Sequence, residues 1–480
     1  MCPTNVLHPA RIAPLALALC FASSGCITTS QEAKLGEEEA KKVEEQMGFV
    51  DDAKLHALVR EIASKLVALS ERADGKWEFH VVDSAEPNAF ALPGGYVYVT
   101  RGLLTLVNSE DELAGVIGHE MGHVTARHTS KRIGAAILTA PVAIATGIAG
   151  AAVGIVAPVL GGLVAGTGQV FSQGLVIAPF SREQEREADE IGQALAARAG
   201  YDPAGITHFL HTLDRAVTMT SGEERKFTIF DSHPLTPERV AATRELAATL
   251  TRASGQPVTK DRADLLARFD GILVGDDPAG GVFEENLFLH PVFDFALEFP
   301  KDWKMANTDA AVGAVSPGED AVVALQIAKM KSTLDEVIKE AQEEQRGLEF
   351  ERSKVEGLPT ARTRVDSRGN YADITLIEYK GDVYGLVGKS ASRAADAYAR
   401  IFESTARSFR ALRSSERNGI QETRLRIRKA QSGESPAAIV DRTKSTWTAE
   451  FLAMANALDG TTFESGTAVK VPISQPYKSR

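Results

Sequence analysis

Cysteine is nearly absent from this 480-residue chain. Its three cysteines are Cys2, Cys20 and Cys26, and no other thiol follows them. This distribution excludes a disulfide framework and cysteine-based catalysis from the body of the protein. It is typical of an exported chain, because stray thiols form unwanted disulfides in an oxidising compartment.

An excess of basic charge is also missing. The chain has 64 acidic and 53 basic residues, which gives a net charge of -11. The sequence shows no basic patch, no internal repeat and no phosphate-cradling loop, since Gly94-Gly95 and Gly161-Gly162 lack the strand–loop–helix setting of a nucleotide site. We therefore expect no nucleic-acid partner.

The most informative stretch that is present reads His119-Glu120-Met121-Gly122-His123, an H-E-x-x-H pattern. Residues 109–112 form a capping-box pattern before it, and apolar residues follow at helical spacing. Two histidines four residues apart lie on one face of a helix, so both imidazoles can reach one metal ion. This pattern is typical of zinc hydrolases. The alternative is a surface helix that carries two histidines by chance.

A catalytic zinc usually takes three protein ligands, so a third is needed from another element. A second capping-box pattern at 181–184 predicts a helix that runs to about Gly200. Glu185 and Asp189 share one face of it, where Glu185 could bind the metal and Asp189 could orient a ligand histidine. Glu187 is a competing ligand, although it projects to roughly the opposite side. The alternative is a solvated acidic helix face.

H-E-x-x-H followed by the E-x-x-x-D pattern of residues 185–189 resembles the gluzincin family that includes the CAAX prenyl proteases and bacterial periplasmic lipoprotein proteases. Three more stretches are similar to that family: Asn88 to Thr100, Arg127-His128, and Ser232-His233-Pro234 with Arg239. The resemblance covers roughly residues 30 to 250. It implies a mainly helical, zincin-type protease domain with a small β-sheet.

The resemblance implies a metal site held by His119, His123 and Glu185, with one Zn²⁺ per chain. Glu120 would be the general base that takes a proton from the attacking water and returns it to the leaving amine.

Three other residues are given roles, two of them from the same resemblance and His128 from its spacing. His233 or Arg239 would stabilise the oxyanion. Alternatively, His233 would be a fourth zinc ligand that holds the enzyme latent. His128 lies off the metal face and is predicted to be structural.

A substrate-binding strand is predicted before the metal helix. Tyr96 to Thr100 combines high β propensity with a preceding Pro-Gly-Gly turn. If it is an edge strand, an extended peptide could pair with it across the zinc; the alternative is an interior hairpin strand. The residues predicted for this role are Asn88, Ala89, Phe90, Gly95, Tyr96 and Val97.

The first 26 residues resemble a lipoprotein signal. Arg11 precedes a short apolar core at 12–22, and Ser23-Ser24-Gly25-Cys26 resembles a lipobox, with serine where leucine is favoured. We expect lipidation of Cys26 and anchoring to the outer membrane, facing the periplasm, because Ile27, and not an acidic residue, stands directly after this cysteine. A plain cleaved signal, and hence a soluble periplasmic protein, is the alternative.

An uncharged stretch at 133–181 interrupts the protease domain. It is long enough for one or two membrane spans, but proline and many glycines break it. It links the two predicted metal-bearing helices, which must meet at one site. We expect a hydrophobic hairpin or loop over the catalytic cleft, with contact to the membrane or to partner subunits as the alternative.

At this length the chain predicts an α+β multidomain protein. The protease domain is expected at 27–252 and a linker at 252–264. Residues 265–412 predict an α+β accessory domain that weakly resembles the PsbP or Mog1 type. Residues 422–475 resemble a lysin motif, a βααβ module associated with peptidoglycan.

Together these features predict a zinc-dependent endopeptidase of the bacterial envelope that cleaves unfolded or misassembled envelope proteins. The main rival is a non-proteolytic assembly or binding factor with a latent zinc site. A peptidoglycan hydrolase, suggested by the lysin-like module alone, is a third alternative.

Overall fold

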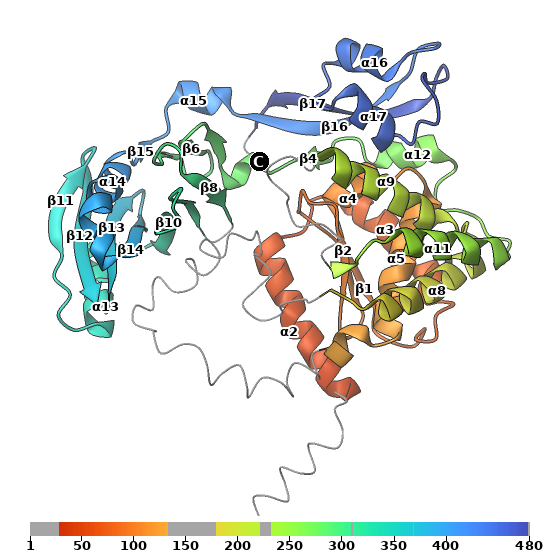
Figure 1. Ribbon diagram of the computed structural model, residues 1–480, viewed down its shortest axis with the longest axis horizontal. Helices are drawn as coiled ribbons and strands as arrows, with labels where there is room; N and C mark the ends of the chain where they lie inside the picture. Colours follow the sequence, from red (N-terminus) through yellow and green to blue (C-terminus); the bar gives the residue numbers. More distant parts are fainter. Residues whose placement is uncertain (1–27, 133–178, 221–231, 309–310, 368, 479–480) are drawn as a thin grey trace, which may run out of the picture.

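The computed structural model describes residues 28–132, 179–220, 232–308, 311–367 and 369–478 (Figure 1). The predicted signal peptide with Cys26, and almost all of the hydrophobic stretch at 133–181, lie outside these residues. Within the described part, no helix is both long and apolar enough to cross a membrane. Several sheets and many helices occur together, which confirms the expected α+β class.

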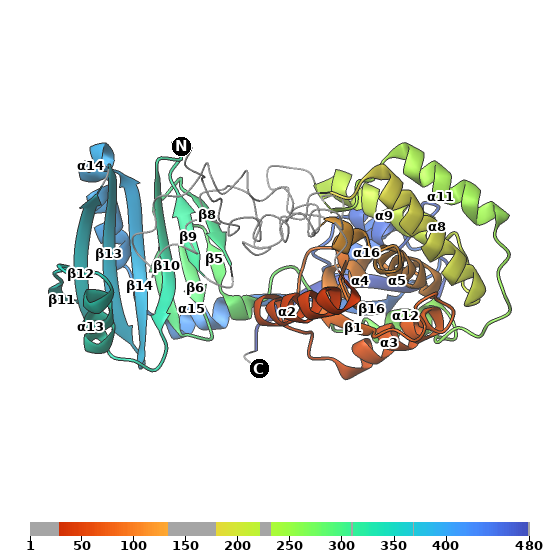
Figure 2. The ribbon, with the colours of Figure 1, turned by 90° about the horizontal axis from the view of Figure 1, so that it is seen from below.

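The chain forms three regions, which we call N-terminal (28–249), middle (276–419) and C-terminal (421–478). The middle region lies to one side of the N-terminal region, and the C-terminal region lies along the N-terminal one (Figures 1 and 2). The elements of the N-terminal region are α2 (Thr29–Met47), α3 (Ala53–Val67), β1 (Glu78–Val82), β2 (Ala89–Leu92), β3 (Tyr96–Thr100), α4 (Arg101–Leu106), α5 (Glu110–Thr125), α8 (Arg182–Arg198), α9 (Gly205–Thr220) and α11 (Pro237–Thr249).

The small sheet of the N-terminal region has the order β1-β3-β2. Strand β3 is parallel to β1 and antiparallel to β2, and all five of its residues are buried. The expectation that Tyr96 to Thr100 is an edge strand is therefore wrong, because this strand has a neighbour on each side. Strand β2 is an edge of the sheet, and it packs beside α5.

Helices α5 and α8 approach each other closely because small residues line their contact. A Cβ atom added to Gly122 would lie 2.6 Å from the carbonyl oxygen of Ala188, and one added to Gly118 would lie 2.9 Å from that of Gly192. Only glycine permits this distance between two backbones. The close approach brings the histidine face of α5 against the acidic face of α8.

The middle region contains two sheets, of order β11-β12-β13-β14-β10-β9-β8 and β15-β7-β6-β5. Alternate residues of β10 face opposite sides, so that Val323 packs toward α14 and Val322 toward α13. The elements are η1 (Pro278–Gly280), β5 (Val282–Glu284), β6 (Leu287–His290), β7 (Phe295–Glu298), β8 (Lys304–Asn307), β9 (Val312–Val315), β10 (Ala321–Lys329), α13 (Leu334–Glu344), β11 (Glu351–Val355), β12 (Leu358–Ser367), β13 (Asn370–Tyr379), β14 (Asp382–Ala391), η2 (Ser392–Ala394), α14 (Ala395–Arg407), β15 (Arg410–Ala411) and α15 (Ser414–Gly419).

The C-terminal region follows the order strand, helix, helix, strand. Its elements are β16 (Gln421–Lys429), α16 (Pro436–Thr443), α17 (Ala449–Ala455) and β17 (Ala468–Pro476). A third strand, β4 (Leu273–Val274), joins this sheet in the order β17-β16-β4 and follows α12 (Arg262–Arg268).

The boundary predicted at residue 265 is too early. Leu265, Leu266 and Phe269 are fully buried in the same core as α5 and α9, and β4 pairs with β16. Residues 262–274 therefore connect the N-terminal and C-terminal regions, and the middle region begins only after them. The local amino-acid composition does not indicate this connection, because the pairing joins segments about 150 residues apart in sequence.

Candidate metal centre

Four buried side chains form one group that could hold a metal ion: His119, His123, Glu185 and His233. His119 and His123 come from α5, and Glu185 comes from the first turn of α8. His233 lies in the segment that leads into α11. One ligand atom from each residue lies within 4.8 Å of all the others. The structure thus brings the three predicted ligands together and adds the predicted fourth.

The spacing of the ligand atoms fits a tetrahedral zinc ion. Nε2 of His119 lies 3.0 Å from Nε2 of His123 and 3.5 Å from Oε2 of Glu185. Nε2 of His123 lies 3.4 Å from Oε1 of Glu185. Ligands at about 2.0–2.1 Å from zinc stand roughly 3.3–3.4 Å apart at the tetrahedral angle. Two imidazoles and a carboxylate are also ligands that zinc prefers.

Local sequence explains why both helices begin where they do. The Ser109 side chain caps α5 by accepting from the Glu112 amide. The Ser181 and Gln184 side chains form a complete capping box at the start of α8. Helix α5 continues for 16 residues from Glu110 and so includes both histidines. His119 and His123 are buried on the side of α5 that faces α8.

Asp189 orients one ligand from behind, as the sequence predicted. Its Oδ1 lies 2.8 Å from Nδ1 of His119, which leaves Nε2 of that ring for the metal. Although burial lowers the pKa of His119, the Asp189 carboxylate outweighs this and raises it to about 9. A metal ion on Nε2 of His119 would compete with a proton for that nitrogen.

The other two ligands are in the charge states that a metal requires. Burial lowers the pKa of His123 well below its ordinary value, so this ring is neutral. Burial alone would raise the pKa of Glu185, but the neighbouring His233, His119 and His123 lower it well below the usual range.

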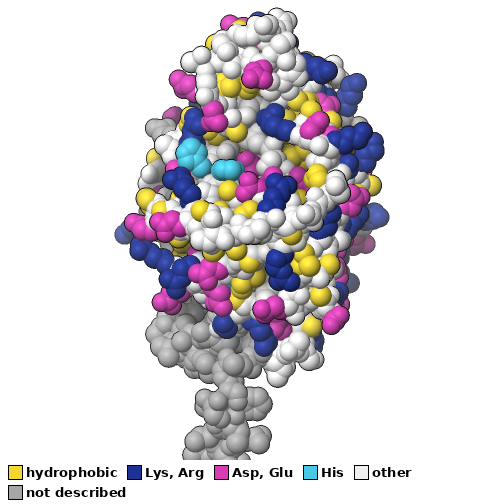
Figure 3. Space-filling view, turned by 90° about the vertical axis from the view of Figure 1, so that its right-hand side faces the viewer, with side chains coloured by type: hydrophobic (Ala, Val, Ile, Leu, Met, Phe, Trp, Pro, Cys, Tyr) yellow, Lys and Arg dark blue, Asp and Glu magenta, His cyan; other side chains and the backbone are white. Residues whose placement is uncertain are grey.

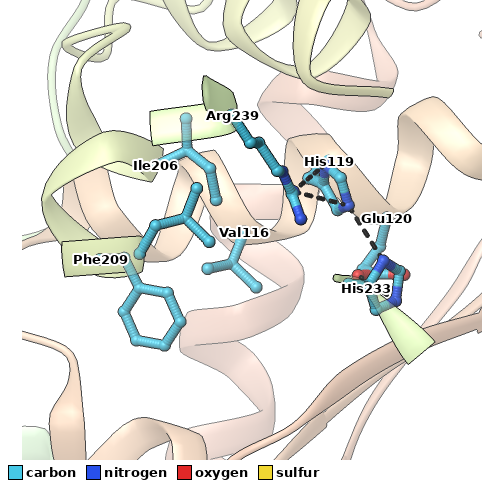
Figure 4. A pocket seen from close by; sticks show the side chains of 8 residues that line it. Val116, His119, Glu120, Ile206, Phe209, His233 and Arg239 are labelled. Carbon is cyan, nitrogen blue, oxygen red and sulfur yellow. Dashed lines mark hydrogen bonds and ion pairs between the residues drawn. The ribbon is translucent and has the colours of Figure 1, made fainter. Parts of the chain in front are cut away.

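Glu120 lies beside this group. Its side chain is 1 % exposed, and its Oε1 has no hydrogen-bond partner among the residues that the structure describes. The same oxygen lies 3.7 Å from Nε2 of His233 (Figure 4). Burying a carboxylate oxygen without a hydrogen-bond partner costs free energy unless water or substrate donates a hydrogen bond to it. This position therefore suits a general base.

Arg239 lies behind the ligands. Its guanidinium donates two hydrogen bonds to Asp189, of 2.8 and 2.9 Å, and its Nη1 lies 2.5 Å from Oε2 of Glu185. Burial opposes its charge, yet Asp189 and Glu185 raise the pKa of Arg239 above its ordinary value. These contacts with the two acids of α8 are a positioning arrangement, and the predicted oxyanion role of Arg239 stays a prediction.

Replacing Arg239 by methionine is expected to destabilise the zinc-free protein by about 3–5 kcal/mol, because two buried carboxylates lose their cation. Urea unfolding of the metal-free protein measures this. Arg244→Met is the matched control, since Arg244 is exposed on the same helix. Equal unfolding midpoints for the two variants would contradict the role given to Arg239.

An apolar pocket opens next to Glu120, between α5 and α9 (Figure 4). The residues that line it are Val116, His119, Glu120, Ile206, Phe209, Leu210, His233 and Arg239. The contribution of α9 was not predicted from the sequence. Its apolar residues at 206, 209, 210 and 213 follow helical spacing, but this pattern does not distinguish a pocket wall from ordinary core.

Two further residues near the metal group differ from expectation. Glu187, considered as a competing ligand, instead contacts His128, with 3.1 Å between its Oε2 and the Nε2 of that ring. His128, predicted to be structural, in turn contacts His123. No spacing rule in the sequence indicated this pair.

The predicted substrate strand is divided between two strands. Ala89 and Phe90 belong to β2, the edge strand near α5, with Asn88 directly before it. Gly95 lies in the connecting turn, and the two residues that follow it belong to the central strand β3.

The fold thus brings together a buried ligand set of the kind that zinc prefers. Residues 50–247, less than half of the chain, match the family model described as Peptidase family M48. The buried ligand group lies within the matched segment.

Curated relatives are similar to part of the chain. The chain is 33% identical over 208 residues to "Mitochondrial metalloendopeptidase OMA1" of Schizosaccharomyces pombe, which covers 42% of this chain and 55% of the relative. It is 29% identical over 250 residues to "Putative beta-barrel assembly-enhancing protease" of Vibrio cholerae, covering 51% of each. It is 33% identical over 168 residues to "Metalloprotease LoiP" of Escherichia coli K12, covering 35% and 61%. The chain thus spans about half the length of the first of these relatives.

Among solved structures, the cyanobacterial PsbP protein of Synechocystis is 15% identical, with a TM-score of 0.23, and the match covers 28% of this chain and 98% of that one. A likeness at this TM-score supports no assignment.

Proposed function

We propose that the protein is a zinc-dependent endopeptidase of the bacterial cell envelope that hydrolyses misfolded or misassembled envelope proteins. The observation that carries the proposal is the buried group of His119, His123 and Glu185, with Glu120 beside it, whose Oε1 has no hydrogen-bond partner among the described residues. The names of the relatives, which include beta-barrel assembly-enhancing proteases, support the envelope setting and the substrate class.

The residues divide the chemistry between them. His119, His123 and Glu185 would hold zinc, which polarises the scissile carbonyl and makes water a stronger nucleophile at neutral pH. Glu120 takes a proton from the attacking water and passes it to the nitrogen of the leaving amine. Asp189 keeps His119 in the tautomer that offers Nε2, and Arg239 keeps Asp189 and Glu185 in place.

His233 is the residue that would control access. Its Nδ1 lies 3.2 Å from Nε2 of His119 and 3.0 Å from Oε1 of Glu185, which is ligand spacing. A fourth protein ligand closes the position that a catalytic zinc keeps for water. This geometry supports a latent state held by His233 more than the alternative role in stabilising the oxyanion.

His233→Ala is therefore expected to raise the rate of β-casein cleavage several-fold, because three ligands remain and the fourth position opens. Gel-based cleavage with zinc quantified on the same sample measures this. A lost rate with retained zinc would instead assign His233 to the oxyanion.

Substrate would lie between the edge strand and the pocket. An extended peptide could add to the edge of the small sheet along β2, while the pocket lined by Val116, Ile206 and Phe209 forms an apolar wall beside Glu120. A peptide bound along β2 would then lie near Glu120.

The location and partners of the protein belong to the same proposal. A lipidated Cys26 would anchor it to the outer membrane, facing the periplasm, and the C-terminal region would contact peptidoglycan or protein. Acidic and basic side chains are interspersed on the face seen in Figure 3. Together with the net charge of -11, this disfavours nucleic acid as a partner.

The test is to purify the protein without Cys26 and to measure bound zinc and β-casein cleavage on one sample. We expect about one zinc per chain and cleavage that a chelator stops. Zinc without cleavage in wild type and in His233→Ala would favour the rival, a binding or assembly factor. Absence of zinc would contradict the proposal at its base.

A further inference from the structure

His123 has a partner on the side of its ring that faces away from the metal group. Its Nδ1 lies 3.0 Å from Nδ1 of His128. The other nitrogen of His128, Nε2, lies 3.1 Å from Oε2 of Glu187. Both histidines are 1 % exposed, whereas the Glu187 side chain is 54% exposed. A hydrogen-bonded chain thus runs from the metal group through two imidazoles to the surface of α8.

Coordination chemistry fixes the direction of every hydrogen bond in this chain. A metal ion on Nε2 of His123 leaves the proton of this ring on Nδ1, which then donates to Nδ1 of His128. His128 accepts there only if its own proton is on Nε2, and that proton is donated to Glu187. Each nitrogen therefore has one role, and only one tautomer of each ring fits.

We propose that His128 and Glu187 are positioning residues that hold His123 in its metal-binding tautomer and orientation. The inference rests on His123 being a zinc ligand, as in the proposed function. Asp189, which lies on α8 like Glu187, supports His119 in the same way. Helix α8 would then provide one carboxylate for the metal and one carboxylate behind each histidine.

The backbone shows why His128 reaches this place although it lies off the helical face of His123. Helix α5 ends at Thr125, and Arg127 adopts a φ of 58°, in the left-handed region that residues with side chains rarely occupy. This turn changes the direction of the chain directly before His128. The Arg127 side chain also pairs with Glu32 of α2, with 2.6 Å between Nη2 and Oε2.

Ring packing holds the pair from another side. Phe180 stacks on His123, with ring centroids 4.0 Å apart and an interplanar angle of 30°. The rings of His123 and His128 meet edge to face, with centroids 5.0 Å apart. A histidine that served only to fill space would not need partners at both nitrogens, and phenylalanine would fill the same space without them.

The experiment measures zinc affinity instead of activity. The zinc dissociation constant is obtained by competition with a chromophoric chelator, and the ligand field is obtained from the absorption spectrum of the Co²⁺-substituted protein. We expect His128→Phe to weaken zinc binding about 10- to 100-fold and to alter the Co²⁺ spectrum. Glu187→Ala should weaken binding in the same direction by a smaller factor, and Glu187→Gln should restore most of it, because the amide oxygen still accepts from His128.

Glu190→Ala is the matched control. Glu190 lies on the same helix, carries the same charge and has a side chain that is 57% exposed, but its ion-pair contact is with Arg186. Equal weakening by Glu190→Ala and Glu187→Ala would overturn the inference, since only net charge would then matter. Unchanged affinity in Glu187→Ala would also overturn it, and this surface change keeps the test valid should His128→Phe fail to fold.

Failure of this inference is distinguishable from failure of the proposed function. A wild-type protein that binds zinc and cleaves casein, while the His128 and Glu187 variants bind zinc equally well, would contradict the inference alone. A wild-type protein that binds no zinc would contradict both.

Discussion

Replacing Glu120 by glutamine is expected to lower kcat/KM for a peptide substrate by about 10²- to 10⁴-fold, the usual contribution of a general base. Zinc should stay bound, because Glu120 is outside the ligand group of His119, His123, Glu185 and His233. Glutamine has nearly the shape of glutamate, so the buried position beside α9 is kept. What is lost is the ability to take a proton from water.

The measurement combines cleavage kinetics with zinc analysis of the same protein. Glu183→Gln is the control, because this residue is exposed on α8 and the change removes the same charge. Full activity in Glu120→Gln would remove this carboxylate from the chemistry. In cells, rescue of a deletion strain by Glu120→Gln as well as by wild type would show that binding, and not proteolysis, is the main role.

The elements that carry the metal group could be predicted because their signals are local. Ser109 and Ser181 mark the starts of two helices through capping patterns, and the structure places caps at both positions. Two histidines four residues apart on such a helix must share a face. A local pattern was not enough to predict the third ligand, because an acidic helix face is common. The family resemblance selected Glu185.

Features that depend on pairing between distant segments could not be predicted. High β propensity identified Tyr96 to Thr100 as a strand, but propensity does not say which strands lie on either side, so the edge was assigned wrongly. The pair formed by His128 and Glu187 depends on a left-handed turn at an arginine, for which no sequence rule exists. The place of residues 262–274 could not be predicted either, because they connect the N-terminal and C-terminal regions through pairing with a distant strand.

The C-terminal region inserts a lysine into the N-terminal region. Lys470 is fully buried, and its Nζ donates to the carbonyl of Val107, directly before the metal helix, at 2.8 Å. Burial lowers the pKa of Lys470 well below its ordinary value and raises that of nearby Glu112 to about 7. Arg262 bridges the same junction by donating to Asn108 at 3.0 Å. These contacts surround the first turn of α5.

Ending the chain at residue 420 is therefore expected to unfold the peptidase, rather than to release an independent binding module. Leu425 and Met454 belong to the same core as α5, and burial of each such side chain contributes about 1.5–3 kcal/mol. Their loss with that of Lys470 and of the strand paired to β4 approaches the whole stability of a typical domain, about 5–15 kcal/mol. Thermal unfolding followed by circular dichroism, together with limited proteolysis, measures this.

A point variant tests the contact made by Lys470 without removing the rest of the C-terminal region. Lys470→Ala should destabilise the full-length protein by about 2–5 kcal/mol, as for other large buried side chains. Lys429→Ala on the paired strand is the control, because Lys429 is exposed. A truncated protein that keeps its melting temperature and its zinc would show that the C-terminal region is a separable appendage. Loss of both would make it a structural support for the helix that carries the metal site.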